Sequence, residues 1–131
     1  RLIIETDAGD AVGVIMLKDI DWKNRRATHG IKLARASDRA RGIGTDALRA
    51  IMRYAFDELQ LHRLDSVILE GNEPSYHMHC DKCGWSPEGR QRQAIFKNGR
   101  YHDLLLIGIL ADDYRRVAAA ERWWDDQPAE R

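Results

Sequence analysis

One helical stripe between two strand-like runs constrains the fold of this chain more than any other feature. Apolar residues recur at spacings of three and four over residues 45–61, the pattern of a helix that packs on a core by one face. The runs at 28–34 and 64–71 on either side are short and strand-like. A strand, a helix and a strand in this order form a crossover, which is the connection that parallel strands need. The stripe consists of Leu48, Ile51, Met52, Ala55, Phe56 and Leu59.

The segments around this crossover predict an antiparallel meander. Short apolar runs at 2–5 and 11–20 are separated by a turn cluster of Asp, Ala and Gly. Near the other end of the chain, Asn98 and Gly99 lie between two β-rich segments, a pattern typical of a tight hairpin.

Two more helices complete the expected order of elements. Pro74 suits the first turn of a short helix at about 75–82, which Gly84 ends. An amphipathic C-terminal helix and a tail cover about 112–131. We therefore expect a single α/β (α+β) domain over residues 1–131, with a mixed, mostly antiparallel sheet and helices on both faces.

Composition argues against several classes of protein. The 21 basic residues balance 21 acidic ones, so overall charge gives no case for a nucleic-acid or membrane-surface partner. No apolar run approaches the roughly 18–20 residues that span a bilayer. Two cysteines three positions apart are a poor disulfide framework, which favours the cytoplasm. Because the chain lacks an initiator Met and opens on a strand, we expect an N-terminally shortened domain.

A glycine loop precedes the main helix and predicts a phosphate site. Gly42 and Gly44 let the backbone approach a ligand closely, and the first helical turn offers unpaired N–H groups to an anion. Arg39 and Arg41 add donors for phosphate oxygens. A Walker loop is excluded because no Gly-Lys-Ser/Thr occurs. A Rossmann loop fits Gly42 to Ala47 formally, but the meander before it opposes that fold.

The pattern Arg39-x-x-Gly42-x-Gly44 resembles the cofactor loop of the GNAT superfamily of N-acetyltransferases. The segments "RARGIGTDALRAIMRYAFDELQLHRLDSVILEGNEPS", "DKCGW" and "EGRQRQAIFKNGRYHDLLLIGIL" are similar to the branch that contains ribosomal-protein N-terminal and spermidine acetyltransferases. The resemblance covers roughly residues 2–115 in the family's order of elements.

The resemblance implies acetyl-CoA as the co-substrate and no metal. The loop's backbone amides would hold the pyrophosphate, the strand before the loop would pair with pantetheine, and the strand at 64–70 would splay away from it. The implied cofactor-binding residues are Ile31, Lys32, Leu33, Arg39, Arg41, Gly42, Ile43, Gly44, Thr45 and Asn72.

The family's reaction, direct attack of a neutral amine on the thioester, needs a base and an acid. Glu70, at the end of its strand, is the candidate base. Relatives keep a tyrosine as the acid for the leaving thiolate. Counting back from Gly84 places Cys80 there, whereas counting forward from Asn72 places His79 there, so we expect one extra residue or a local bulge. Tyr76, one turn earlier, is a third candidate acid.

The stretch "HMHCDKC" at 77–83 holds both cysteines and two histidines, which suggests a zinc site at first sight. Four ligands on one short helix cannot surround a tetrahedral ion, and the sequence offers no second Cys or Cys/His knuckle. Zinc binding is therefore the weakest alternative.

We expect an N-acetyltransferase that acts on a primary amine of a peptide or protein N-terminus, a polyamine or a small molecule. The alternative is a GNAT-fold module that binds CoA without turnover, or a truncated inactive domain. A homodimer is a further expectation, since Trp123 and Trp124 mark either a self-association surface or packing on the domain itself.

Overall fold

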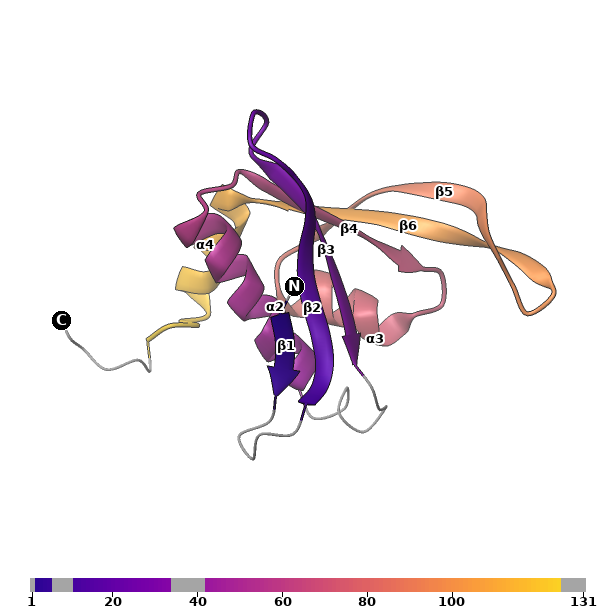
Figure 1. The fold of residues 1–131 in the computed structure, drawn as a ribbon, viewed down its shortest axis with the longest axis horizontal. Coiled ribbons are helices and arrows are strands. Elements are labelled where there is room, and N and C mark those ends of the chain that lie inside the picture. The colour runs from indigo at the N-terminus through magenta and orange to yellow at the C-terminus, as the bar shows by residue number, and fades with distance from the viewer. Residues whose placement is uncertain (1, 6–10, 34–41, 126–131) are drawn as a thin grey trace.

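The computed structural model describes residues 2–5, 11–33 and 42–125, which form one sheet with helices packed against it (Figure 1). Six strands pair in the order β1-β2-β3-β4-β6-β5. Each neighbouring pair is antiparallel except β3 and β4, which confirms a mixed, mostly antiparallel sheet. The strands are β1 (Leu2–Glu5), β2 (Ala11–Asp21), β3 (Arg26–Leu33), β4 (Arg63–Leu69), β5 (Ser86–Lys97) and β6 (Arg100–Leu110).

Two of the described helices continue directly into π-helical turns. The helix expected at 45–61 is confirmed as α2 with η1, and the one expected at 75–82 as α3 with η2. The helical segments are α2 (Ile43–Arg53), η1 (Tyr54–Glu58), α3 (Glu73–Tyr76), η2 (His77–Lys82) and α4 (Ala111–Ala120).

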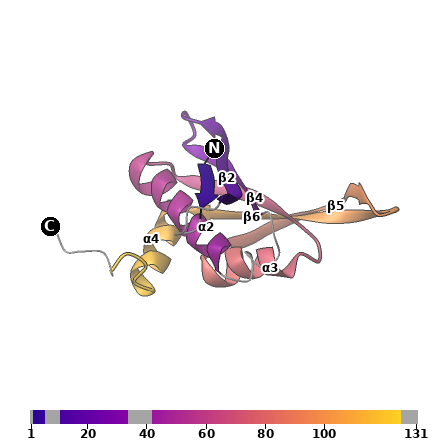
Figure 2. The ribbon, with the colours of Figure 1, turned by 60° about the horizontal axis from the view of Figure 1, so that its bottom comes forward.

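All the described helices pack on the same face of the sheet (Figure 2). Phe56 of η1 stacks on Tyr114 of α4 with ring centroids 5.1 Å apart, so the two helices share one core layer. Along β4, Leu64 and Ile68 are buried in that core, whereas Val67 points the other way and is 52% exposed. Our expectation of helices on both faces is therefore wrong for the described residues, because the outward positions of β4 are polar or exposed.

The parallel pair β3–β4 opens along its length. Cα pairing begins at Arg26 and Arg63 and ends at Thr28 and Asp65, although both strands continue beyond that point. Where the strands part, the Ser66 hydroxyl donates a hydrogen bond of 2.9 Å to the carbonyl of His29. The slot expected between these strands is present, and the Ser66 side chain links the two strands where the slot begins.

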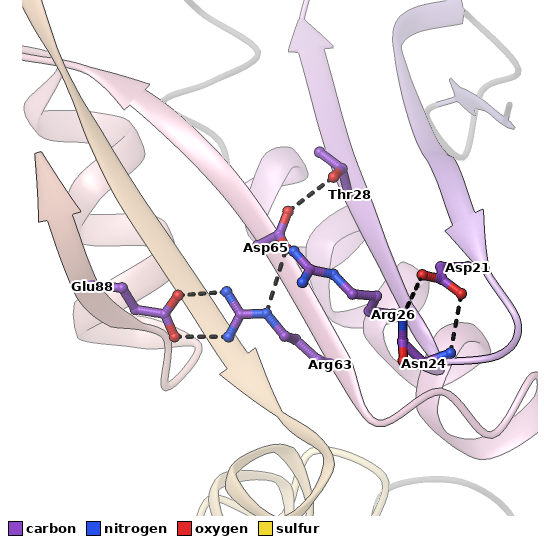
Figure 3. Close-up of polar contacts among 7 residues, drawn as sticks. All are labelled: Asp21, Asn24, Arg26, Thr28, Arg63, Asp65 and Glu88. Atoms are coloured by element: carbon purple, nitrogen blue, oxygen red, sulfur yellow. Dashed lines mark hydrogen bonds and ion pairs between the residues drawn. The ribbon is translucent and has the colours of Figure 1, made fainter. Parts of the chain in front are cut away.

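A ladder of charged side chains crosses the helix-free face of the sheet (Figure 3). Asp65 on β4 accepts hydrogen bonds from Thr28 Oγ1 at 2.9 Å and from Arg26 Nη2 at 2.8 Å, both on β3. Arg63 Nε lies 3.4 Å from Asp65, and its Nη1 donates to Glu88 of β5 at 2.9 Å. Hydrogen bonding to Arg63 lowers the pKa of Glu88. The ladder joins three strands on the face that no described helix covers.

The ladder depends on a glycine. Arg63 and Glu88 meet across β6, and a Cβ added at Gly108 would lie 2.7 Å from the Glu88 carboxylate oxygens. We expect Gly108→Ala to displace this flexible carboxylate and to lower the free energy of unfolding by about 0.5–1 kcal/mol, the value of a partly exposed ion pair. Urea unfolding of Gly108→Ala, Glu88→Ala and the double variant measures this loss. We expect Gly108→Ala to have no such cost when Glu88 is absent. Equal costs in both backgrounds would contradict the account.

Candidate functional site

A cavity of about 250 Å³ lies between β3, the start of α2 and the α3–η2 helix. It brings together five of the residues expected to bind the cofactor, although they come from three separate segments of the chain. A larger, open hollow of about 680 Å³ at the β2–β3 turn contains none of them. The residues lining the smaller cavity are Ile31, Gly42, Gly44, Thr45, Asn72, Pro74, Ser75, His77, Met78 and Lys82.

Lys32 and Ile43, two of the other expected cofactor residues, are not among those lining this cavity. Ile43 packs partly against the core, Lys32 is exposed on β3, and Leu33 is the last residue of β3. Arg39 and Arg41 lie outside the described residues.

The N-terminus of α2 presents backbone donors to the cavity. Gly42 is the N-cap residue with φ 78°, and no side chain caps the helix. The first intrahelical bond runs from Asp46 N to Gly42 O at 3.1 Å, so the amides of Ile43, Gly44 and Thr45 precede it and have no acceptor within the helix. Such amides, with the helix dipole, attract an anion such as phosphate.

Asn72 is held at the cavity by its role as a helix cap. Its side-chain oxygen accepts a hydrogen bond of 3.3 Å from Ser75 N, and Pro74 occupies the first turn of α3. This local geometry follows from the sequence, because Asn is a favoured N-cap and Pro is tolerated in the first turn of a helix.

Five lining residues were not predicted from the sequence, namely Pro74, Ser75, His77, Met78 and Lys82. The π-helical turn η2 explains part of this, because its i→i+5 bonding brings residues five positions apart close together, where an α-helix would separate them. His77 and Lys82 are five apart, so both reach the cavity. His77 Nδ1 also lies 2.9 Å from Asp81 Oδ2.

The expectation for this segment was one extra residue or a local bulge, and the π-helical turn η2 is such a bulge. The effect of this turn on His79 was not predicted from the sequence. The His79 ring turns into the core and is 2% exposed. His79 Nδ1 donates to the Ser75 carbonyl at 2.9 Å, and its Nε2 lies 2.8 Å from Nε2 of His29. His79 therefore does not reach the cavity, and the position expected for an acid holds a buried imidazole pair instead.

Tyr76 and Cys80, the other candidate acids, are half-buried and pack against the core. Neither is among the residues lining the cavity. Burial, and then the nearby Asp81, raise the pKa of the Cys80 thiol. This places both side chains beside the cleft rather than in it.

Glu70 directly follows β4 and lines an open hollow of about 440 Å³, and it is not among the residues lining the cavity beside α2. Its Oε1 accepts a hydrogen bond of 3.0 Å from Asp103 N, and its Oε2 lies 3.4 Å from Arg90 Nη1. Its side chain is 38% exposed, so the carboxylate is held in place and still open to solvent.

Among the described residues, no three His, Cys, Asp or Glu side chains are grouped so that they could hold a metal ion. In the same part of the chain, none of the helices has the length and apolarity to cross a bilayer.

The parallel strand pair β3–β4, which opens beside the glycine-led N-terminus of α2, defines a domain with the fold of solved N-acetyltransferases. One similar solved structure is that of spermidine N-acetyltransferase from Vibrio cholerae in complex with CoA and spermine. It matches with a TM-score of 0.78 and 25% identity, over 85% of this chain and 64% of that one.

Residues 1–85 match the acetyltransferase (GNAT) domain family, and the chain belongs to that family. It is 34% identical to "Putative ribosomal N-acetyltransferase YdaF" of Bacillus subtilis over 81% of this chain and 57% of the relative. It is 30% identical to spermidine N(1)-acetyltransferase of Escherichia coli over 87% of this chain and 60% of the relative. The chain thus spans about three-fifths of the length of these relatives.

Proposed function

We propose that this chain binds acetyl-CoA in the cavity beside α2 and transfers the acetyl group to a primary amine. The observation that carries the proposal is the set of amides at Ile43, Gly44 and Thr45, which have no acceptor within the helix and lie at the start of α2 beside the cavity. A Cβ at Gly42 would meet nothing within 4 Å, so the backbone there is open to a pyrophosphate. His77 and Lys82 on the facing wall add groups suited to phosphate oxygens.

Isothermal titration with acetyl-CoA tests this proposal directly. We expect one binding site per chain, and the absence of both heat and a thermal shift at millimolar acetyl-CoA would overturn it. Release of free thiol on addition of spermidine then tests transfer. A polyamine is the first acceptor to try, because one solved neighbour holds spermine together with CoA. Peptide N-termini and small amines are the next.

In the proposed reaction, acetyl-CoA supplies the thioester and the amine attacks it directly in a ternary complex. The open edge of β3 near Ile31 would offer a backbone N–H to the developing oxyanion, since no described strand pairs with β3 on that side of the slot. Glu70 would accept the proton that the ammonium must lose before attack. Thiolate protonation would fall to Tyr76 or Cys80 beside the cleft.

The role of Glu70 can be separated from its structural bonds by Glu70→Gln. The amide oxygen of Gln still accepts from Asp103 N, but Gln cannot act as a base. We expect kcat/KM to fall by about 100-fold or more, as on loss of a general base, with acetyl-CoA affinity unchanged. Asp103→Asn is the matched control, since it weakens the hydrogen bond from Arg90 to Asp103 and leaves the Glu70 carboxylate in place. Equal losses in the two variants would assign Glu70 a structural role.

A binding module that holds CoA without turnover is the alternative, and the absence of the family's tyrosine motivates it. Tight CoA binding with no thiol release across a panel of amines would favour this alternative. Because CoA binding and thiol release are measured on the same protein, the test distinguishes loss of chemistry from loss of cofactor binding.

We further propose that the chain acts as one domain over 1–131, in the cytoplasm, as a homodimer. The tryptophan pair gives no support for the dimer, because both rings pack on the chain itself. Arg49 lies 4.9 Å over Trp123, and Arg53 lies 4.6 Å over Trp124. Light scattering of the purified protein decides between monomer and dimer.

A further inference from the structure

The hollow of about 440 Å³ that Glu70 lines lies between the end of β4 and the tip of the β5–β6 hairpin. This hairpin extends away from the described helices and turns at Asn98 and Gly99 (Figure 1). One wall of the hollow is formed by residues 69–71 and the other by residues of the hairpin tip. Glu70, the proposed base, therefore shares this hollow with the hairpin.

The strand register turns the cations of the hairpin tip toward the hollow. Lys97, Arg100 and His102 all line it. Lys97 pairs with Arg100, and Phe96 pairs with Tyr101. Because alternate residues of a strand point to the same face, the two cations and His102 share one face and the two aromatic rings lie on the other. His102 Nε2 donates a hydrogen bond of 3.0 Å to the Lys97 carbonyl, which links the two strands at this wall.

These two cations have no acid partner in the part of the chain that the structure describes. Neither Lys97 nor Arg100 forms an ion pair there. Glu70 is the only acid among the described residues that line the hollow, and its carboxylate is bound to other groups. Its Oε1 accepts from Asp103 N at 3.0 Å, and its Oε2 lies 3.4 Å from Arg90 Nη1. The hollow thus places a held carboxylate across from two cations whose charge is left for a ligand.

This arrangement of charges selects among acceptor amines. A guanidinium and an ammonium bind a carboxylate through charge-assisted hydrogen bonds, whereas they repel a second cation. We propose that the acceptor is an amino acid, whose amine faces Glu70 and whose carboxylate binds Lys97 and Arg100. This inference rests on the proposed function and narrows its acceptor, because a polyamine carries no group that these cations can bind.

The transfer step is the one of the proposed function. The ammonium group of the amino acid gives one proton to Glu70, and its nitrogen then attacks the thioester carbon. The N–C bond forms and the C–S bond breaks, while the nitrogen loses a second proton and the CoA thiolate gains one. The products are the N-acetyl amino acid and CoA. The proton on Glu70 passes to solvent, to which the side chain is 38% exposed.

Thiol release with γ-aminobutyrate and with its amide, γ-aminobutyramide, tests the proposal, because the two acceptors differ in the charge of one group. We expect the wild type to prefer the acid. Lys97→Gln/Arg100→Gln should lower kcat/KM for the acid by about 10- to 100-fold, the value of hydrogen bonds to a charged group, and leave kcat/KM for the amide unchanged. Each protein is assayed with both acceptors, so the difference in amine basicity cancels.

Lys18→Gln/Lys23→Gln is the matched control, since it removes the same charge from exposed positions on β2 and the β2–β3 turn. That turn lies at the start of β4, whereas Glu70 follows its end. The control should keep the preference for the acid, and unchanged melting temperatures should show that both double variants fold. Equal losses in the two double variants would overturn the carboxylate site in favour of overall charge.

The remaining outcomes separate this inference from the proposed function. Equal thiol release with the acid and the amide, or faster release with spermidine, would overturn the amino-acid acceptor and leave acetyl transfer standing. Amide chemical shifts of residues 97–102 on titration with γ-aminobutyrate report the carboxylate site without turnover. Shifts there with no thiol release from any amine would overturn acetyl transfer and support the carboxylate site. The absence of shifts at tens of millimolar γ-aminobutyrate would overturn the carboxylate site.

Discussion

Gly42→Glu and Gly44→Glu are each expected to lower the affinity for acetyl-CoA by about 100-fold or more, because they place a carboxylate where the phosphates would bind. Both glycines line the cavity at the start of α2. Gly42 has open space for a side chain, and its φ of 78° adds a conformational cost of about 1 kcal/mol. Gly44 is buried, so its variant also fills the space that the phosphates would occupy. Isothermal titration measures both losses.

Ala50→Glu is the matched control for this experiment. Ala50 is exposed on the same helix and does not line the cavity, so its variant adds the same charge without filling the proposed phosphate site. Circular dichroism melts of all three variants without ligand separate unfolding from loss of binding. If Gly42→Glu stays folded and binds acetyl-CoA like the control, the phosphate site is not at this helix.

The elements that depend on local chemistry were predicted from the sequence. The stripe from Leu48 to Leu59, the cap at Asn72 and the turn at Asn98-Gly99 each follow from a few neighbouring residues, and each is present. The parallel pairing of β3 with β4 also followed from the position of the helix between these two strands. The faces of the sheet did not, because which face the helices cover depends on packing among all the elements together.

The residues of the candidate site also fall into two groups, those positioned by local sequence and those positioned by packing. Gly42, Gly44 and Asn72 meet at the cavity because loop and cap chemistry positions them. His77 and Lys82 were missed because the π-helical turn changes which residues share a side. His79 was misplaced because its environment is set by His29, which lies 50 positions away in the sequence. Spacing along one helix could not reveal that contact.

The pair formed by His29 and His79 should make the protein sensitive to acid. Both rings are 2% exposed, and burial lowers the pKa of His29 to about 3 and also lowers that of His79. In the unfolded chain both take up protons near pH 6.5. Stability contributed by the neutral pair is therefore fully present above pH 6.5 and is lost as pH falls toward 3. At about 1.36 kcal/mol per unit, His29 alone removes roughly 2.5 kcal/mol between pH 6.5 and pH 4.5.

The geometry explains why the folded pair resists protonation. His79 Nδ1–H donates to the Ser75 carbonyl, so His79 Nε2 must accept from Nε2–H of His29. This leaves His29 Nδ1 buried without a hydrogen-bond partner, and a proton there would place an uncompensated charge beside Trp85.

Urea unfolding at pH 7.0 and pH 4.5 measures this sensitivity against His29→Leu/His79→Leu, in which two apolar side chains of similar size replace the pair. Carboxylates titrate in both proteins, so the difference between their pH dependences isolates the imidazoles. We expect the wild type to lose at least about 2.5 kcal/mol more than the variant, since each imidazole that is neutral when folded adds to the slope. Nitrogen chemical shifts of His29 give a second measure that needs no variant. A ring already protonated at pH 5 in the folded protein would contradict the buried neutral pair.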